Sequence, residues 1–69
     1  MNRLRELRED RDLSQAEVAK ILHTTQQQYS KIETGKADMS CEKLVLLAQY
    51  YKLSADYILG LSDDASRQN

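Results

Sequence analysis

The sequence has no proline, two glycines, one cysteine and one histidine among its 69 residues. The lone Cys41 has no partner for an internal disulfide, and nothing in the chain resembles a Cys/His metal site. The longest apolar runs, at 44–48 and 57–59, are far shorter than the roughly 20 residues of a membrane span. A charged, amphipathic stretch follows Met1 at once, where a signal peptide would be apolar. These absences predict a small domain in the reducing cytoplasm that binds no metal, cofactor or membrane.

The shortness of the chain also bears on catalysis. A chain of this size forms one domain and buries only about 60% of its extended surface. With two glycines and one histidine, it has few of the residues that build a water-excluding catalytic site. We therefore expect a protein that is not an enzyme.

An excess of positive charge is missing as well. Ten Lys/Arg and eleven Asp/Glu give a net charge of −1, which by itself argues against a nucleic-acid partner. The charges are uneven, since residues 1–36 carry seven basic and six acidic side chains, whereas residues 37–69 carry three and five. Any binding of DNA must therefore depend on where single charges are placed.

Two helix-start signals stand close together in the N-terminal half. Ser14-Gln15-Ala16-Glu17 is a capping box, in which the hydroxyl and the carboxylate each satisfy a backbone N–H at a helix start. Thr25-Gln26-Gln27-Gln28 repeats this pattern, with Gln28 as the capping partner, and only His23-Thr24 separates it from Leu22. This spacing predicts two helices joined by a tight turn. The first should bury an apolar side made of Ala16, Val18, Ala19 and Leu22, with Ile21 at its margin.

The other segments are also predicted to be helical, and no stretch alternates with the period of a strand. The helix that begins at Thr25 should end near Thr34, because Gly35 suits the left-handed position after a helix. Residues 62–69 are polar and aperiodic, which predicts a frayed tail. The predicted fold class is all-α, with about five helices around one core. The remaining helices are expected over 3–11, from Ser40 with Leu44, Leu47, Ala48 and Tyr51 buried, and from Ser54 to Gly60.

The predicted helix from Thr25 has one face without acidic residues. Tyr29 and Ile32 point to one side, and the opposite side carries Gln26, Gln27, Ser30, Lys31 and Thr34. Glutamine pairs with adenine through two hydrogen bonds, and lysine donates to guanine, so such a face suits the major groove of DNA. The plainer alternative is an ordinary solvated helix start.

Four segments follow one another in a family-specific order and spacing: Leu13–Ala19, Thr25–Gln27, Tyr29–Lys36 and Leu53–Gly60. In this arrangement they resemble the Cro/CI-type helix-turn-helix family of phage and bacterial repressors, also called the Xre family. The resemblance covers nearly the whole chain. It implies a compact, five-helix, lambda-repressor-like domain over 1–61, with the motif at about 15–34 and a polar C-terminal tail at 62–69.

The resemblance implies a role for each residue that matches the family's motif. Gln26, Gln27 and Lys31 match positions of the recognition helix that contact bases. Arg8 and Glu33 match a pair that joins the first helix to the end of the recognition helix; the alternative is an exposed pair of little effect. The positions near the sugar-phosphate backbone are matched by Gln15, Thr25, Ser30, Thr34 and Lys36.

The sequence departs from the family's pattern at two loops. His23 stands where the family usually has glycine, and a positive φ there would cost of order 1 kcal/mol. Asp38-Met39 stands where the family often has proline before its fourth helix. His23 is not expected to be a ligand or a catalytic base, and Cys41 is expected to be a small side chain rather than a redox sensor.

The function implied by the resemblance is a sequence-specific transcriptional regulator, a repressor that binds a palindromic operator in double-stranded DNA as a homodimer. It would be encoded by a bacterium or a phage and act in the cytoplasm, at the nucleoid. Two recognition helices related by a two-fold axis would read half-sites about one helical turn apart. Tyr50, Leu59 and Leu61 are candidates for the dimer contact, because the C-terminal part has more apolar residues than one core face needs. The alternative is an antitoxin-type, protein-binding module that also represses its own operon, with a toxin or an antirepressor as a possible partner.

Overall fold

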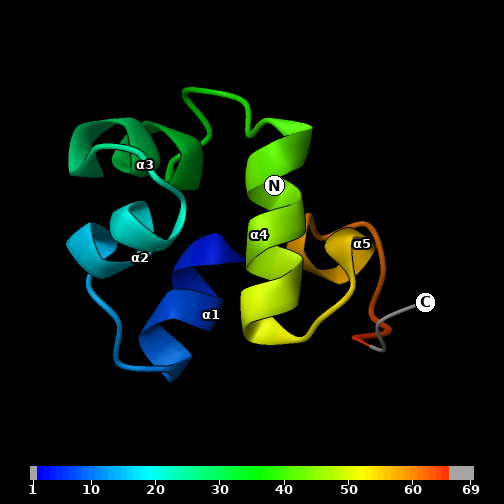
Figure 1. The fold of residues 1–69 in the computed structure, drawn as a ribbon. Coiled ribbons are helices and arrows are strands. Elements are labelled where there is room, and N and C mark those ends of the chain that lie inside the picture. Colours follow the sequence, from blue (N-terminus) through cyan, green and yellow to red (C-terminus); the bar gives the residue numbers. More distant parts are fainter. Residues whose placement is uncertain (1, 66–69) are drawn as a thin grey trace.

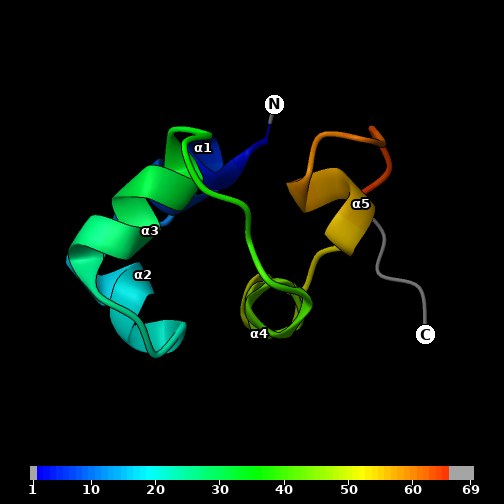
Figure 2. The ribbon, with the colours of Figure 1, turned by 90° about the horizontal axis from the view of Figure 1, so that it is seen from above.

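The computed structural model describes residues 2–65, which contain five α-helices and no strand (Figure 1). The predicted all-α class is therefore confirmed. Figures 1 and 2 show that α1, α2 and α3 lie on one side of α4 and that α5 lies on its other side. The bounds are α1 (Leu4–Asp10), α2 (Gln15–Ile21), α3 (Gln26–Glu33), α4 (Cys41–Tyr51) and α5 (Ala55–Ile58).

Hydroxyl side chains begin four of these helices, as the sequence predicts. The capping box of α2 is complete, because the Glu17 N–H donates to Ser14 Oγ at 3.0 Å and the Ser14 N–H donates to Glu17 Oε1 at 2.9 Å. Ser40 and Ser54 cap α4 and α5 with the hydroxyl alone, which accepts from the N–H groups of Lys43 and Tyr57 at 3.2 and 3.1 Å. At α3 the Thr25 hydroxyl accepts from the Gln28 N–H at 3.1 Å, but the Gln28 side chain makes no return bond within residues 2–65. The capping box predicted there is thus only half formed.

Residues with positive φ end or join the helices. After α3, Gly35 has a φ of 81°, and the N–H groups of Gly35 and Lys36 donate to the carbonyls of Ile32 and Lys31. This pair of hydrogen bonds ends the helix at Gly35, as predicted. His23 in the turn between α2 and α3 has a φ of 56°, the conformation for which the family usually has glycine. Asp12 and Lys52 also adopt positive φ, which the sequence analysis does not foresee.

The core draws on every helix. Leu47 and Tyr51 of α4 are buried as predicted, whereas Leu44 and Ala48 are only half-buried. Ala16 is exposed, so its predicted burial is wrong. It lies about 160° around α2 from Val18, and Gln15 occupies the place on the inner side. The buried side chains are Leu4, Leu7, Val18, Ala19, Leu22, Tyr29, Ile32, Leu47, Tyr51 and Ile58.

Part of the predicted tail is bound to the rest of the fold. Arg3 Nη2 donates to the Ser62 carbonyl at 3.3 Å and to Asp63 Oδ1 at 3.1 Å. The Ser54 N–H donates to the carbonyl of Ala65 at 3.2 Å. Residues 62–65 are therefore not frayed, because polar contacts that periodicity does not reveal hold them against the starts of α1 and α5. Residues 66–69 of the predicted tail lie outside the described residues.

Candidate nucleic-acid interface

The short connection between α2 and α3 fixes the position of α3. The N–H groups of His23 and Thr24 donate to the carbonyls of Lys20 and Ala19 at 3.1 and 2.9 Å. These bonds fix the conformation of the turn. Tyr29 and Ile32 then bury the inner side of α3 in the core. The opposite side of α3 is consequently presented to solvent as one rigid surface.

The predicted contact residues gather on that surface. Gln26, Gln27 and Lys31 are exposed and Ser30 is half-buried. Together with Gln15 at the start of α2, these residues line one shallow groove. The structure thus brings together five residues that the sequence analysis assigns to bases and to the DNA backbone. We call this set, Gln15, Gln26, Gln27, Ser30 and Lys31, the α3 face.

Most polar groups of the α3 face are available to a ligand. The side chains of Gln26, Gln27 and Lys31 form no hydrogen bond or ion pair with any of residues 2–65. The amides therefore offer both donors and acceptors to a base edge, and the ammonium offers donors only. Extended, unpartnered side chains of this kind are able to adapt to a groove of DNA.

The hydroxyls that flank the α3 face differ in their availability. Among the described residues, Thr25 Oγ1 accepts a bond from the Gln28 N–H but donates none, so its own proton is available to a phosphate. The Thr34 hydroxyl instead donates to the Ser30 carbonyl at 2.9 Å and, less directly, to the Lys31 carbonyl at 3.3 Å. Thr34 would have to break these bonds before donating to DNA. Lys36 is exposed just beyond the end of α3.

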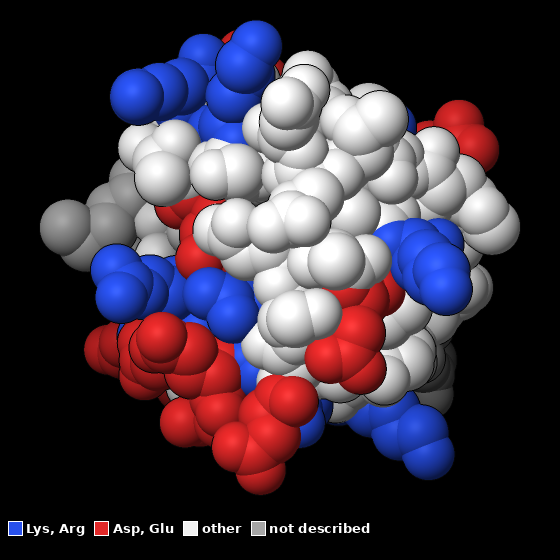
Figure 3. Space-filling view, turned by 90° about the vertical axis from the view of Figure 1, so that its left-hand side faces the viewer, with Lys and Arg blue, Asp and Glu red and all other residues white. Residues whose placement is uncertain are grey.

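Charges of both signs lie on this side of the molecule, but the α3 face itself has no acidic residue. Figure 3 looks at the side that carries α2 and α3, and a broad uncharged surface occupies much of the view, with Lys and Arg side chains along some of its edges and Asp and Glu side chains along others. The largest group of acidic side chains lies at the lower left, below the level of α3. The α3 face itself contains Lys31 and no acidic residue. Local placement therefore compensates for the net charge of −1.

An ion pair predicted between α1 and α3 lies behind this surface. Arg8 Nε and Nη2 donate to the two carboxylate oxygens of Glu33 at 2.9 and 3.0 Å. Their side chains are only 13% and 3% exposed, so this is not the exposed pair that formed the alternative. Arg8 Nη1 also donates to the Leu13 carbonyl at 2.8 Å, which anchors the loop before α2. The pair thereby joins α1, α3 and the entry to α2.

Gln15 is connected to the same pair. Its side-chain Nε2 donates to Glu33 Oε1 at 3.5 Å, a long and therefore weak bond. This leaves the second N–H of the Gln15 amide and its carbonyl oxygen for another partner. The sequence analysis misses this contact. The place of Gln15 on the inner side of α2, three residues before Val18, is the signal that would have indicated it.

The surroundings of Glu33 keep its carboxylate charged. Burial alone would raise the pKa of Glu33, but the hydrogen bonds from Arg8 and the positive charge of Arg8 outweigh burial and lower that pKa overall. The bond to Glu33 in turn raises the pKa of Arg8. Burial raises the pKa of the neighbouring Tyr29, whose hydroxyl lies near the carboxylate without a hydrogen bond of regular geometry. Both members of the pair are thus fully ionised at neutral pH.

Of the candidate dimer residues, Tyr50 lies on α4, whereas Leu59 and Leu61 follow the end of α5, and none of them belongs to the α3 face. Tyr50 and Leu61 are 47% and 75% exposed. Leu59 is half-buried.

Residues 2–65 contain no group of His, Cys, Asp and Glu side chains that would hold a metal ion. Among the same residues, every helix is too short or too polar to span a bilayer.

Comparisons with known proteins agree with this geometry. A family model described as helix-turn-helix matches residues 4–58. YobD of Bacillus subtilis, named an uncharacterized HTH-type transcriptional regulator, is 39% identical over 62 residues. That alignment covers 90% of this chain and 55% of YobD, so the chain spans about half the length of the curated relative it matches. No solved structure shows significant similarity. On the family match and the arrangement of α2 and α3, the chain belongs to the Cro/CI-type helix-turn-helix family of transcriptional regulators.

Proposed function

We propose that this protein is a sequence-specific DNA-binding regulator of transcription that inserts α3 into the major groove. One observation carries the proposal: Gln26, Gln27 and Lys31 have no side-chain partner among residues 2–65 and lie on a surface without acidic residues. In the groove, the two glutamines would pair with adenine N6/N7 and the lysine would donate to guanine O6/N7. The name of the relative YobD supports this assignment.

Contacts to the sugar-phosphate backbone would set the position of α3. Gln15, Thr25, Ser30 and Lys36 surround the base-reading residues and each has a donor free to bind phosphate oxygen. Thr34 contributes less, because its proton is already donated to the protein backbone. Backbone contacts carry no sequence information but fix register and orientation on the duplex.

We further propose that two copies bind a palindromic operator and repress by covering a promoter. A single α3 of eight residues reaches only a few base pairs, whereas two helices related by a two-fold axis read both half-sites. Tyr50, Leu59 and Leu61 are the proposed contact between copies, because two of them are large, exposed apolar side chains. Such a repressor acts in the cytoplasm without any chemical step.

Selection of bound duplexes from a random DNA pool tests this function. The expected product is a two-fold symmetric site whose half-sites lie about one helical turn apart, with adenine and guanine at the most constrained positions. Because few cations face the DNA, few counterions are released on binding, so affinity for the selected site should fall only shallowly as the salt concentration rises. A pool that shows no enriched sequence, or tight binding of every duplex at physiological salt, would contradict the proposal.

The antitoxin-type alternative makes a different demand on the molecule. It requires the same DNA-binding surface and, in addition, a surface that binds another protein. The exposed apolar side chains Val45, Tyr50 and Leu61 supply apolar area outside the α3 face. A toxin-like gene beside the gene for this chain would favour the alternative.

A further inference from the structure

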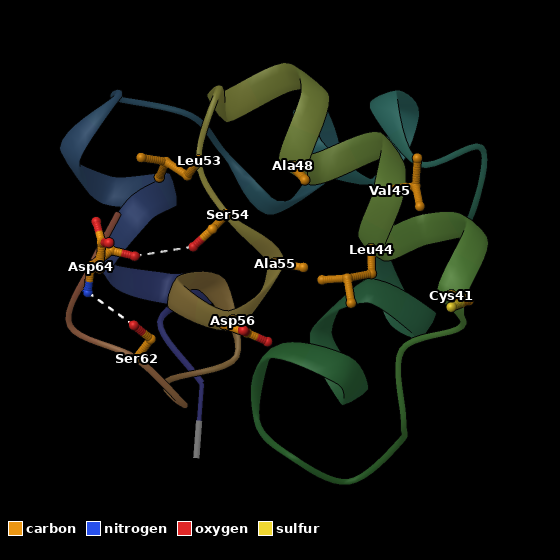
Figure 4. A pocket seen from close by; sticks show the side chains of 10 residues that line it. All are labelled: Cys41, Leu44, Val45, Ala48, Leu53, Ser54, Ala55, Asp56, Ser62 and Asp64. Atoms are coloured by element: carbon orange, nitrogen blue, oxygen red, sulfur yellow. Dashed lines mark hydrogen bonds between the residues drawn. The ribbon is translucent and has the colours of Figure 1, made fainter. Parts of the chain in front are cut away.

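A second groove, of about 400 Å³, lies between α4 and α5 (Figure 4). None of its lining residues belongs to the α3 face. We call it the α4–α5 groove. Its lining consists of Cys41, Leu44, Val45, Ala48, Leu53, Ser54, Ala55, Asp56, Ser62 and Asp64.

The floor of the α4–α5 groove is an apolar stripe that the core covers only in part. Cys41, Leu44, Val45 and Ala48 follow one another on α4 at the spacing i, i+3, i+4, i+7, which places them on one side of the helix. Val45 is 51% exposed although it is a large apolar residue. Leu53 and Ala55 continue the apolar surface across to α5. Helices bury such stripes against another helix.

The wall opposite α4 is held in place by hydrogen bonds. The Ser54 hydroxyl donates to the Asp64 carbonyl at 3.1 Å, and the Asp64 N–H donates to Ser62 Oγ at 3.0 Å. Both bonds are drawn in Figure 4. The groove is consequently formed before any partner arrives, which lowers the ordering cost of binding.

The rim of the groove carries charge of one sign. Asp56 lines it, and none of the lining residues within 2–65 is Lys or Arg. Asp56 is exposed in the first turn of α5. Apolar floor and acidic rim together select a partner that combines apolar anchors with positive charges.

We propose that the α4–α5 groove binds an amphipathic helix of a different protein, with apolar residues at i, i+3, i+4 and i+7 and Lys or Arg beside them. An isologous contact of two copies through this groove would bring the acidic rims of both copies together, and like charges in contact are costly. The acidic rim also repels DNA, because both carry negative charge. The partner would bind without blocking α3, because the two surfaces share no residue.

Titration of the ¹⁵N-labelled full chain with synthetic peptides tests the proposal. The probe is a helical peptide with Leu at i, i+3, i+4 and i+7 and Lys at the flanking positions, and the matched peptide has Glu for Lys. We expect amide shifts at Val45, Ala48 and Ala55, and binding of the Lys peptide at least ten times tighter than that of the Glu peptide. DNA affinity should change less than twofold when the Lys peptide is bound.

Two variants locate the binding. Val45→Glu should weaken the Lys peptide at least tenfold and Asp56→Asn several-fold, whereas Ala16→Glu, at an exposed apolar residue of α2 that lines neither groove, should have no effect. Circular dichroism checks that each variant is folded, and the exposed rim variant Asp56→Asn remains decisive if Val45→Glu unfolds. The proposal is overturned if the shifts map elsewhere, if the Glu peptide binds equally well, or if Val45→Glu abolishes a homodimer instead. Since the peptide titrations and their variants require no operator binding, their failure is distinct from failure of the proposed DNA-binding function.

Discussion

Breaking the ion pair between Arg8 and Glu33 should destabilise the whole domain. The pair has two bonds of 2.9 and 3.0 Å and side-chain exposures of 13% and 3%, so Glu33→Ala leaves the Arg8 guanidinium largely desolvated beside the Leu13 carbonyl alone. Exposed pairs are worth at most about 1 kcal/mol, whereas removing one member of a buried pair costs about 3–5 kcal/mol. We expect Glu33→Ala to cost about 2–4 kcal/mol, which is most of the roughly 3–5 kcal/mol that a domain of this size has.

Urea denaturation followed by circular dichroism measures this loss in a double-mutant cycle with Arg8→Ala. The expected coupling energy is above about 1.5 kcal/mol. Arg5 and Glu9 provide a matched control, because they form an exposed pair at 3.4 Å on α1 with side-chain exposures of 74% and 56%. Their cycle should give less than about 0.5 kcal/mol. If Glu33→Ala does not fold, the isosteric Glu33→Gln takes its place in the cycle. A coupling energy for Arg8 and Glu33 no larger than that of the control would refute the reasoning.

Three further outcomes follow from the same geometry. His23→Gly should raise the free energy of unfolding by about 0.5–1 kcal/mol in urea denaturation, because φ at His23 is 56° and its side chain is exposed; a less stable variant would mean that His23 makes an unseen contact. Because the folded pKa of Glu33 lies below its ordinary value of 4.5, the charged carboxylate stabilises the fold above that pH, and this stability is lost as the pH falls through the lowered pKa. Urea midpoints measured between pH 7 and pH 3 should show that loss in the wild type and less of it in Glu33→Gln, and equal loss in both would assign it to other carboxylates. Tyr50→Glu and Leu61→Glu should shift the protein from dimer to monomer in sedimentation equilibrium at micromolar concentration, and an unchanged state would place the dimer contact elsewhere.

Local sequence patterns predict most of the fold. The capping residues Ser14, Ser40 and Ser54 and the helix end at Gly35 depend on bonds between near neighbours in the chain, and spacing alone identifies them. The positive φ of Lys52 has no such local signal, since nothing in a lysine indicates a left-handed residue. It follows from how α4 must turn into α5.

Prediction of the site is limited by contacts between distant residues. Periodicity places Gln26, Gln27 and Lys31 on one side of a helix, but their grouping with Gln15 depends on how α2 packs against α3. Arg8 and Glu33 are 25 residues apart, and only the family resemblance links them before the structure does. Arg3 contacts Ser62 and Asp63, which are even further away in the sequence, and the sequence analysis misses these contacts.

The central claim, that α3 distinguishes bases, is tested most directly by fluorescence anisotropy with Gln27→Ala and Lys36→Ala. Each variant is titrated with the selected operator and with a duplex of unrelated sequence at the same salt concentration. Gln27→Ala should lose about 1–3 kcal/mol on the operator, roughly 5- to 150-fold in Kd, and almost nothing on the unrelated duplex. Lys36→Ala should weaken both duplexes by the same factor. If Gln27→Ala weakens both duplexes equally, or neither, α3 does not distinguish bases through this residue and the account is wrong.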